Sequence, residues 1–166
     1  AGNDIKFLDD GTQIGQIEMA ASSGFHFRSI ESNADIRFKG NDGGSTITAL
    51  LLDMSEAGHA IFNSSVNVAT HARGTLTTDN DGSFDMNASN NFKCTPSGNF
   101  TLTFTNISAQ SGNILLINSG GHTVSAHANT KVDANILGTI STAGTYLLAY
   151  FSDGTNVYMT NSAVYT

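Results

Sequence analysis

One short phrase occurs twice in the chain, and it constrains the fold more than any other feature. The first copy, DIKFLDDGTQI, begins at Asp4, and the second, DIRFKGNDGGSTI, begins 31 residues later at Asp35. In both copies Ile and Phe alternate with a basic residue, which is typical of a β-strand with one apolar face. The acidic, glycine-containing segment that follows is typical of a hairpin turn. The repeat therefore predicts two similar hairpins with no helix between them, which favours an elongated array over an enzyme core.

The composition supports an all-β fold. Thr, Ser, Asn and Gly supply 71 of the 166 residues (19, 18, 17 and 17 respectively). Thr favours strands, while the other three favour the turns between strands. Hydrophobic residues make up 39% of the chain and fall in alternating runs, so a core can form and disorder is disfavoured. The single cysteine, Cys94, lies in a predicted strand, where a buried, inert thiol is favoured over a reactive one.

The charge balance excludes two classes of partner. Seven basic residues face fourteen acidic ones, giving a net charge of −7, and neither half of the chain is basic. We therefore expect no nucleic-acid partner and no attraction to membranes. No apolar run approaches the roughly 18–20 residues of a membrane helix, and the first twenty residues do not form a signal peptide. Since the chain opens in mid-pattern without Met, we expect it to be a piece of something longer.

Residues 1–68 are predicted to form a shaft of hairpins. The segment ALLLDMSEAG, from Ala49, could be mistaken for a helix, but Gly58 would end it after barely two turns. We therefore predict a strand followed by a turn there, and no other segment has the apolar spacing of a helix. The expected strands are 4–8, 13–19, 24–29, 35–39, 46–53, 59–63 and 66–68.

Residues 69–166 are predicted to form a β-sandwich or jelly-roll-like knob. In FTLTFT, from Phe100, aromatic and aliphatic residues alternate with threonines, so one face is apolar and the other carries hydroxyls. NILLIN, from Asn113, and TYLLAYF, from Thr145, are continuous apolar runs, as expected for central strands covered on both faces. Asp153-Gly154-Thr155 is predicted to close a hairpin. About eight strands at roughly ten-residue spacing are typical of a two-sheet fold.

The small size of the hairpin array predicts self-association. Two hairpin repeats bury too little apolar surface to be stable alone, because repeat arrays need about three or more units. Their polar strands would also leave unpaired edges, which invite aggregation unless they are covered. Several identical chains can wrap together and cover each other's edges. We therefore predict an intertwined homotrimer, with residues 1–68 as the shaft and residues 69–166 as the knob.

The segment from Asp35 to Asn63, DIRFKGNDGGSTITALLLDMSEAGHAIFN, resembles one found in fibre-like structural proteins of tailed bacteriophages, especially marine ones. In that family D-I-x-F-x-G-x-D-G-G leads to L-x-L-D-M-S-x-A-G-x-A-x-F-N, and DIKFLDDGTQIGQIEM resembles the phrase that precedes it. The segment from ARGTLTTDNDG to GTYLLAYFSDGTNVYM is similar to the β-rich carboxy-terminal knob of such proteins. The resemblance implies a tail or capsid fibre of the virion that is homotrimeric, contacts other virion proteins and recognises a host. It implies no cofactor and no catalytic residue.

The sequence predicts no metal, cofactor or catalytic site. DNDG, from Asp79, has the acids of a calcium loop, but Asn90 occupies the twelfth position, where the loop requires Glu, so an Asx-rich turn is favoured. The five histidines lack ligand spacing, and no G-x-S-x-G elbow is present. The chain also lacks a recognisable anchoring domain and the length of parallel β-helix found in glycan-degrading tail spikes. We therefore predict that the protein is not an enzyme, and the resemblance to phage fibre proteins implies that it is located in the virion.

The knob also carries candidates for receptor binding. An exposed aromatic ring beside carboxylate and amide groups is typical of sugar recognition. Two loops, residues 79–84 and 153–158, have this chemistry. The alternative is that the rings of Phe84 and Tyr158 face the core. A different class of function, a secreted bacterial carbohydrate-binding or adhesin module, also fits these loops. The candidate contacts for a host glycan or protein receptor are Asp79, Asp81, Phe84, Asp153, Asn156 and Tyr158.

Overall fold

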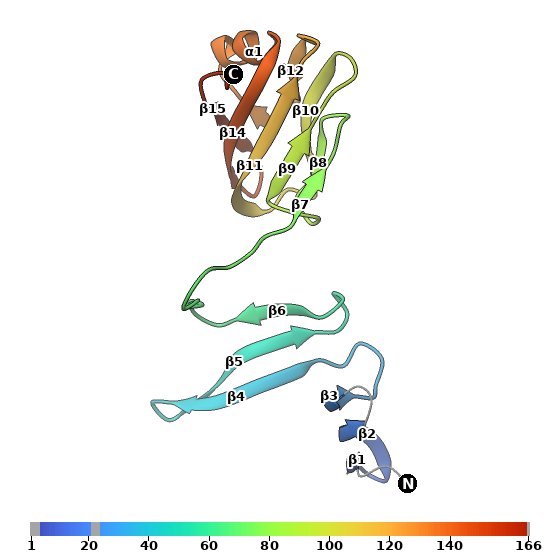
Figure 1. Cartoon of the computed structure of the whole chain (residues 1–166). Coiled ribbons are helices and arrows are strands. Elements are labelled where there is room, and N and C mark those ends of the chain that lie inside the picture. Colours follow the sequence, from blue (N-terminus) through green and yellow to red (C-terminus); the bar gives the residue numbers. More distant parts are fainter. Residues whose placement is uncertain (1–3, 21–23, 166) are drawn as a thin grey trace. The chain divides into compact units, whose positions relative to one another are not determined.

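The computed structural model describes residues 4–20 and 24–165, and almost all of its regular structure is β-strand. The chain divides into two compact units, Ala1–Thr70 (unit 1) and His71–Thr166 (unit 2). The division lies two residues after the boundary expected from the change in sequence character. Figure 1 shows the strands of both units, and the all-β expectation agrees with them apart from one short helix.

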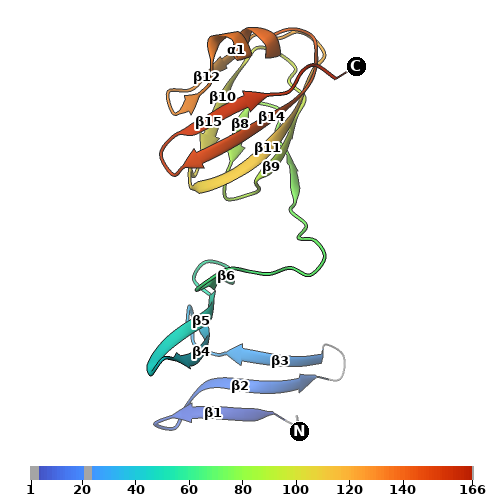
Figure 2. The ribbon, with the colours of Figure 1, turned by 90° about the vertical axis from the view of Figure 1, so that its left-hand side faces the viewer.

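Unit 1 consists of two antiparallel meanders of three strands each, in which every strand pairs with the next one along the chain. Figure 2 shows the strands of the first meander side by side. The first meander is β1 (Ile5–Asp9), β2 (Thr12–Ala20) and β3 (Gly24–Ser29), and the second is β4 (Ile36–Asp42), β5 (Ser45–Asp53) and β6 (His59–Phe62).

The repeated phrase produces the same bulged hairpin twice. In β1–β2 the register shifts directly after Phe7, and in β4–β5 it shifts directly after Phe38, 31 residues later. Both hairpins close through two residues with positive φ, Asp10-Gly11 (45° and 79°) and Gly43-Gly44 (58° and 93°). Two adjacent positive φ angles define a type I′ turn, whose twist matches that of the flanking strands. The two predicted hairpins are therefore confirmed, and the bulge is a shared feature that alternation alone did not reveal.

The segment that begins at Ala49, which could be mistaken for a helix, forms a strand followed by a turn. Strand β5 runs to Asp53, whose carboxylate accepts hydrogen bonds from the backbone N–H groups of Ser55 (3.0 Å) and Glu56 (3.3 Å). Gly58 then completes the turn with a φ of 81°. This prediction is confirmed, whereas the strand predicted at 66–68 is wrong, because those residues pair with no strand.

Unit 2 is built from two sheets and one helix. The larger sheet has the strand order β13-β15-β14-β11-β9-β7, and the smaller one has the order β12-β10-β8. The elements are β7 (Leu76–Thr78), β8 (Ser83–Asp85), β9 (Asn91–Cys94), β10 (Phe100–Thr105), β11 (Ala109–Asn118), β12 (Val124–Ala126), β13 (Thr130–Lys131), α1 (Ala134–Ile140), β14 (Gly144–Asp153) and β15 (Val157–Asn161).

From β7 to β13 the chain alternates between the two sheets, so that strands next to each other in a sheet run parallel. This pattern resembles a short, flattened coil, to which β14 and β15 add an antiparallel hairpin. The parallel pairs depart from the antiparallel pairing expected of a jelly roll. Alternating side chains reveal that a segment is a strand but not which strand it pairs with. The sequence therefore did not indicate this parallel pairing.

The hydrophobic core lies in unit 2. The alternation predicted for β10 is confirmed, since Phe100, Leu102 and Phe104 are buried while the threonines between them point outward. The ring of Phe104 packs against those of Phe84 and Tyr150, with centroids 5.5 and 5.0 Å apart. A core lined by both sheets gives unit 2 the means to fold by itself.

Helix α1 was not expected from the sequence. It begins after Asp133, whose carboxylate accepts a hydrogen bond from the backbone N–H of Asn135 (2.8 Å), and it buries Ile140. The fully buried Asn118 side chain donates to the carbonyl oxygens of Ile140 and His122, both at 2.8 Å, which secures the end of the helix. A helix of seven residues spans too few turns to show a recognisable apolar period.

The prediction that the central strands are covered on both faces is wrong for a single copy of the chain. Ile114 and Leu116 of β11 are buried, but Leu147 and Phe151 of β14 are 38% and 60% exposed. Only one face of the larger sheet packs against the core, and the continuous apolar runs place Leu and Phe on the other face as well.

Gly112 is a position where the fold does not accept a side chain. A Cβ atom there would collide with the carbonyl oxygen of Asn90 and lie 2.6 Å from the Tyr150 hydroxyl. We expect Gly112→Ala to lower the free energy of unfolding of unit 2 by about 2–3 kcal/mol, because overpacking forces the backbone to shift. Gly98→Ala is the matched control, since nothing lies within 4 Å of a Cβ at that position. Denaturant unfolding followed by tyrosine near-UV circular dichroism tests this expectation, and equal stability of the two variants would contradict it.

Candidate functional site

The first meander of unit 1 carries its large apolar side chains on one face. The register places Ile5, Ile17 and Phe27 opposite one another across the three strands. Because side chains two residues apart on a strand share a face, the cross-strand pair Met19–Phe25 extends this row. The Phe25 and Phe27 rings are in edge contact, with centroids 5.0 Å apart. We call this set the first apolar face: Ile5, Phe7, Ile17, Met19, Phe25 and Phe27.

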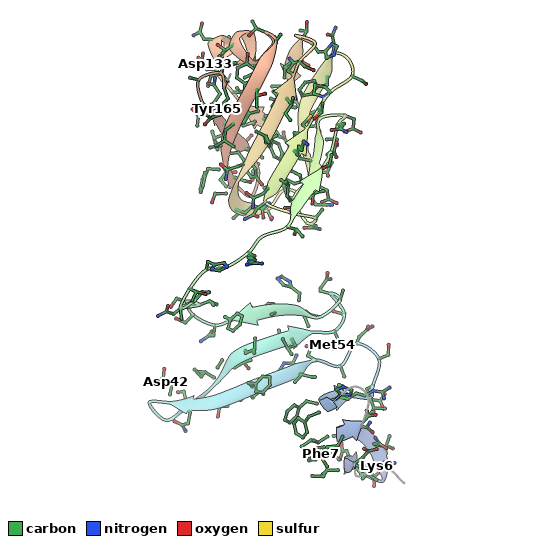
Figure 3. The ribbon with its side chains drawn as sticks, in the orientation of Figure 1. Lys6, Phe7, Asp42, Met54, Asp133 and Tyr165 are labelled. Atoms are coloured by element: carbon green, nitrogen blue, oxygen red, sulfur yellow. The ribbon has the colours of Figure 1, made fainter. Side chains whose placement is uncertain are left out.

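The opposite face of the same meander is mostly polar. The Glu18 carboxylate lies 3.9 Å from the Arg28 guanidinium and 4.0 Å from the His26 ring. Lys6 belongs to this face and Phe7 to the apolar one, and both are labelled in Figure 3. The meander therefore has one polar face, which is suited to contact with water, and one apolar face, whose exposure to water is unfavourable.

The second meander has a corresponding apolar face. Ile36 and Phe38, the counterparts of Ile5 and Phe7, each begin a cross-strand row of apolar side chains on β4, β5 and β6. The same bulged register thus presents the same kind of surface in both meanders. We call this set the second apolar face: Ile36, Phe38, Leu50, Leu52, Ala60 and Phe62.

Neither apolar face is buried in a single copy of the chain. No described residue between 4 and 70 is buried, and Phe25 and Phe27 are each 59% exposed. A shallow groove of about 360 Å³ runs along Phe7, Ile17 and Phe27, and Asp35 and Arg37 form part of its lining. Unit 1 therefore has regular sheets with apolar faces and no core of its own.

In unit 2 the structure brings together three of the predicted receptor contacts, at the turn between β14 and β15. The Asp153 carboxylate accepts hydrogen bonds from the backbone N–H groups of Asn156 (2.7 Å) and Thr155 (2.8 Å), and from the Tyr158 hydroxyl (3.2 Å). The backbone hydrogen bonds lower the pKa of Asp153, and the Asp153 charge raises the pKa of Tyr158. Tyr158 is 47% exposed, so its ring does not face the core.

The other three candidates lie around β8. Asp79 and Asp81 form consecutive Asx turns, because each accepts a hydrogen bond from the backbone N–H two residues later (3.2 and 2.8 Å). Partial burial raises the pKa of Asp79, and the hydrogen bond with Asp79 lowers the pKa of Asp81. Phe84 is fully buried, and its ring lies against those of Phe92 and Phe104. The prediction of Phe84 as a receptor contact is wrong, since the alternation of β8 turns this ring into the core.

Phe151 was missed as a surface residue. It is the cross-strand partner of Tyr158, it is 60% exposed, and both rings line a shallow depression of about 350 Å³ with Ala149 and Thr160. Phe151 ends a continuous apolar run, and such a run predicts a strand that is covered on both faces. The exposed ring pair, beside the Asp153 carboxylate, is the part of unit 2 best suited to contact a ligand.

Other chemistry is sparse within the described part of the chain. No group of three or more His, Cys, Asp or Glu side chains there is arranged to hold a metal ion. Among the same residues no helix has the length and apolarity needed to span a membrane. Cys94 is fully buried, as expected, and burial together with the nearby Asp79 and Asp81 charges raises the pKa of its thiol to about 12.

No known protein family, no curated protein and no solved structure matches the chain.

The contact between Asp153 and Tyr158 can be tested by titration. We expect Asp153→Asn to bring the pKa of Tyr158 back toward about 10, because the substitution removes the negative charge beside the phenol. Asp133→Asn, at the start of α1, removes an exposed acid elsewhere and should leave Tyr158 unchanged. NMR of ring-labelled tyrosine across the alkaline range measures both variants, and an unaltered Tyr158 titration in Asp153→Asn would exclude the contact.

Proposed function

We propose that this protein is a non-enzymatic structural component of a tailed-phage virion appendage, a tail fibre or capsid fibre. In this proposal unit 1 is a hairpin-repeat shaft in which three copies associate, and unit 2 is a sandwich-like knob. The observation that carries the proposal is that unit 1 has two regular apolar faces and no buried residue among those described. Such faces require a partner, and a shaft made of identical copies provides one.

The energetics favour association of unit 1. Burying one Ile, Phe or Met side chain contributes roughly 1.5–3 kcal/mol. The six side chains of the first apolar face therefore offer on the order of 10 kcal/mol per copy if association removes them from water. A three-stranded sheet needs such cover, because isolated meanders that lack a packed apolar face are only marginally stable.

A second copy suits these faces better than an unrelated partner. The first apolar face carries no charge, so identical faces meet without repulsion between ions. Three meanders around an axis would turn their apolar faces inward and leave the row around Glu18 and Arg28 in water. The same bulged hairpin recurs in the second meander, so the same arrangement can repeat along the axis.

The phage setting is supported by the resemblance of the segment from Asp35 to Asn63. That segment corresponds to the second meander, in which the D-I-x-F and D-G-G elements form the bulge and the type I′ turn. Under this proposal the protein is located in the virion, its partners include other virion proteins, and it requires no cofactor. The ring pair Phe151–Tyr158 beside Asp153 is the proposed contact for a host cell-surface glycan or protein.

One observation favours a second candidate function. Unit 2 has its own core and an exposed ring pair beside a carboxylate, which would suit a secreted bacterial carbohydrate-binding or adhesin module. This alternative accounts for unit 2 but leaves the apolar faces of unit 1 without a partner. The phage fibre is therefore the preferred proposal.

The solution mass of the full chain tests the proposal. Light scattering at several concentrations should give the mass of a trimer that does not change on dilution. A monomer with exposed apolar faces would overturn the shaft and favour the secreted module. A dimer or tetramer would retain self-association but exclude the threefold arrangement.

Two adjacent residues of β2 provide a matched test of the first apolar face. Ile17 points to the apolar face and Gln16 to the polar one, so both can be replaced by Ser at neighbouring positions. We expect Ile17→Ser to destabilise the assembly by about 2–4 kcal/mol per chain, because a large side chain is lost from a buried seam. Gln16→Ser should destabilise the assembly less, by about 1 kcal/mol, because it removes only side-chain hydrogen bonds with Gln13 and Glu18 on the polar face. Equal effects on the denaturant midpoint of dissociation would contradict a buried apolar face.

Removal of unit 1 separates assembly from folding. A chain of residues 71–166 should keep its tyrosine near-UV circular dichroism, because the core lies entirely within it. Its oligomers should dissociate at concentrations where the full chain stays assembled. If the shortened chain were as strongly associated as the full chain, unit 1 would not be the main site of assembly.

A further inference from the structure

We propose that the outer face of the larger sheet of unit 2 binds a saccharide, at the end of the sheet where β14 turns into β15. This inference rests on the receptor contact proposed above and narrows its ligand to one chemical class. It does not require the shaft, because every residue of the site lies in unit 2. We call these residues the ring platform: Ser111, Asn113, Ala149, Phe151, Tyr158 and Thr160.

Two aromatic rings form one end of the ring platform. Phe151 of β14 and Tyr158 of β15 lie directly opposite each other in the register, and they are 60% and 47% exposed. Neighbouring strands lie about 4.8 Å apart, so the two rings are neighbours on one surface. An exposed ring face packs well against the C–H groups of a sugar ring. The pair therefore supplies the apolar half of a saccharide site.

The turn that follows β14 keeps the Tyr158 ring in place. Two backbone N–H groups of this turn hold the Asp153 carboxylate, which accepts a hydrogen bond from the Tyr158 hydroxyl at 3.2 Å. The phenol is thereby fixed at its outer end by a group that the backbone itself orients. A side chain that is ordered before the ligand arrives loses less entropy on binding.

The next cross-strand row of the ring platform is polar on both sides of a small residue. Ala149, two residues before Phe151, lies opposite Asn113 of β11 and Thr160 of β15. This row is about 7 Å from the rings, because a strand rises about 3.4 Å per residue. The rings and Thr160 line a depression of about 350 Å³ over Ala149. That volume is near the lower limit for small-ligand sites, which suits a short stretch of saccharide.

The polar groups of the ring platform are available to a ligand. Within the part of the chain that the structure describes, the Ser111 and Thr160 hydroxyls make no hydrogen bond. The Asn113 amide makes one long contact, at 3.5 Å, with the Asn91 side chain. Sugar hydroxyls both donate and accept, so they can pair with hydroxyl and amide groups alike. These groups therefore supply the polar half of the site, which orients a ligand.

The mixture of groups on this face favours a saccharide over an apolar protein surface. Such a surface would also cover Asn91 and Lys93, which share the face with Asn113. Each polar group buried without a partner costs about 1–3 kcal/mol. A sugar ring carries C–H groups on its faces and hydroxyl groups around its edge. It therefore meets the ring pair and the polar row at the same time.

Tyrosine signals report binding directly, because the two exposed tyrosines lie at opposite ends of β14. Tyr158 is beside Phe151, whereas Tyr165 is beside Thr145. We expect neutral oligosaccharides of glucose, galactose, mannose or N-acetylglucosamine to shift the Tyr158 signals in NMR of the ring-labelled full chain. The best of these probes should have a Kd in about the millimolar range, because a shallow site buries little of its ligand. The Tyr165 signals should stay unchanged.

Two substitutions separate ring stacking and hydrogen bonding from general apolar contact. Phe151→Leu keeps an apolar side chain but removes the ring face, and it should weaken binding about tenfold. Thr160→Val removes one hydroxyl at nearly constant volume and should weaken binding about threefold to tenfold. Both positions are exposed, so neither change disturbs the core. Thr105→Val makes the same change at an exposed position of the smaller sheet and should leave the affinity unaltered.

The solution mass of the same samples separates failure of this inference from failure of the proposed fibre. If the chain is a trimer and no probe shifts Tyr158, the saccharide is excluded and a protein becomes the proposed receptor. If a probe binds but Phe151→Leu binds it as tightly as the unsubstituted chain, the ring platform is overturned as the site. A monomer that responds as expected would overturn the fibre and leave the saccharide site standing in a secreted module. A monomer without any shift would overturn both.

Discussion

An amphipathic sheet is stable only when something removes its apolar face from water, and the two units of this protein meet that requirement differently. In unit 2 the smaller sheet covers the inner face of the larger one, and Phe84, Leu102 and Tyr146 are almost completely buried between them. The described residues of unit 1 form no second layer, because the segments that follow its meanders add no covering strand or helix. The two units differ in this respect, since the larger sheet of unit 2 has an internal cover, whereas unit 1 would gain one from the proposed association of copies.

The repeated phrase explains why the same requirement arises twice. Phe7 and Phe38 each precede a bulge, and each hairpin closes with two residues in the left-handed region. A bulge strengthens the twist of a hairpin at a defined point, so the repeat conserves the shape of the surface as well as its composition. The functional proposal depends on this combination of shape and apolarity, which a repeated composition alone would not provide.

Sequence reasoning succeeded where local chemistry decides the structure. Adjacent Asp-Gly and Gly-Gly pairs specify tight turns, and strict alternation in β10 specifies which side chains enter the core. Sequence reasoning failed where the structure depends on which strands or layers pack together. The parallel pairing of β8 with β10 joins residues twenty positions apart, and α1 is stabilised by the distant side chain of Asn118. Phe84 and Phe151 were both misjudged for this reason, because their exposure depends on whether a second layer lies over that position.

The connection between the units has a consequence for the lifetime of the full chain. Residues 63–75 are exposed throughout, lack regular structure and include Arg73, so they are an accessible substrate for a protease that cleaves after basic residues. Cleavage there would leave the core of unit 2 intact, because no core residue lies before Phe84. A protease could thus separate a folded unit 2 from unit 1, and the site of that cut is encoded in a segment without strands or helices.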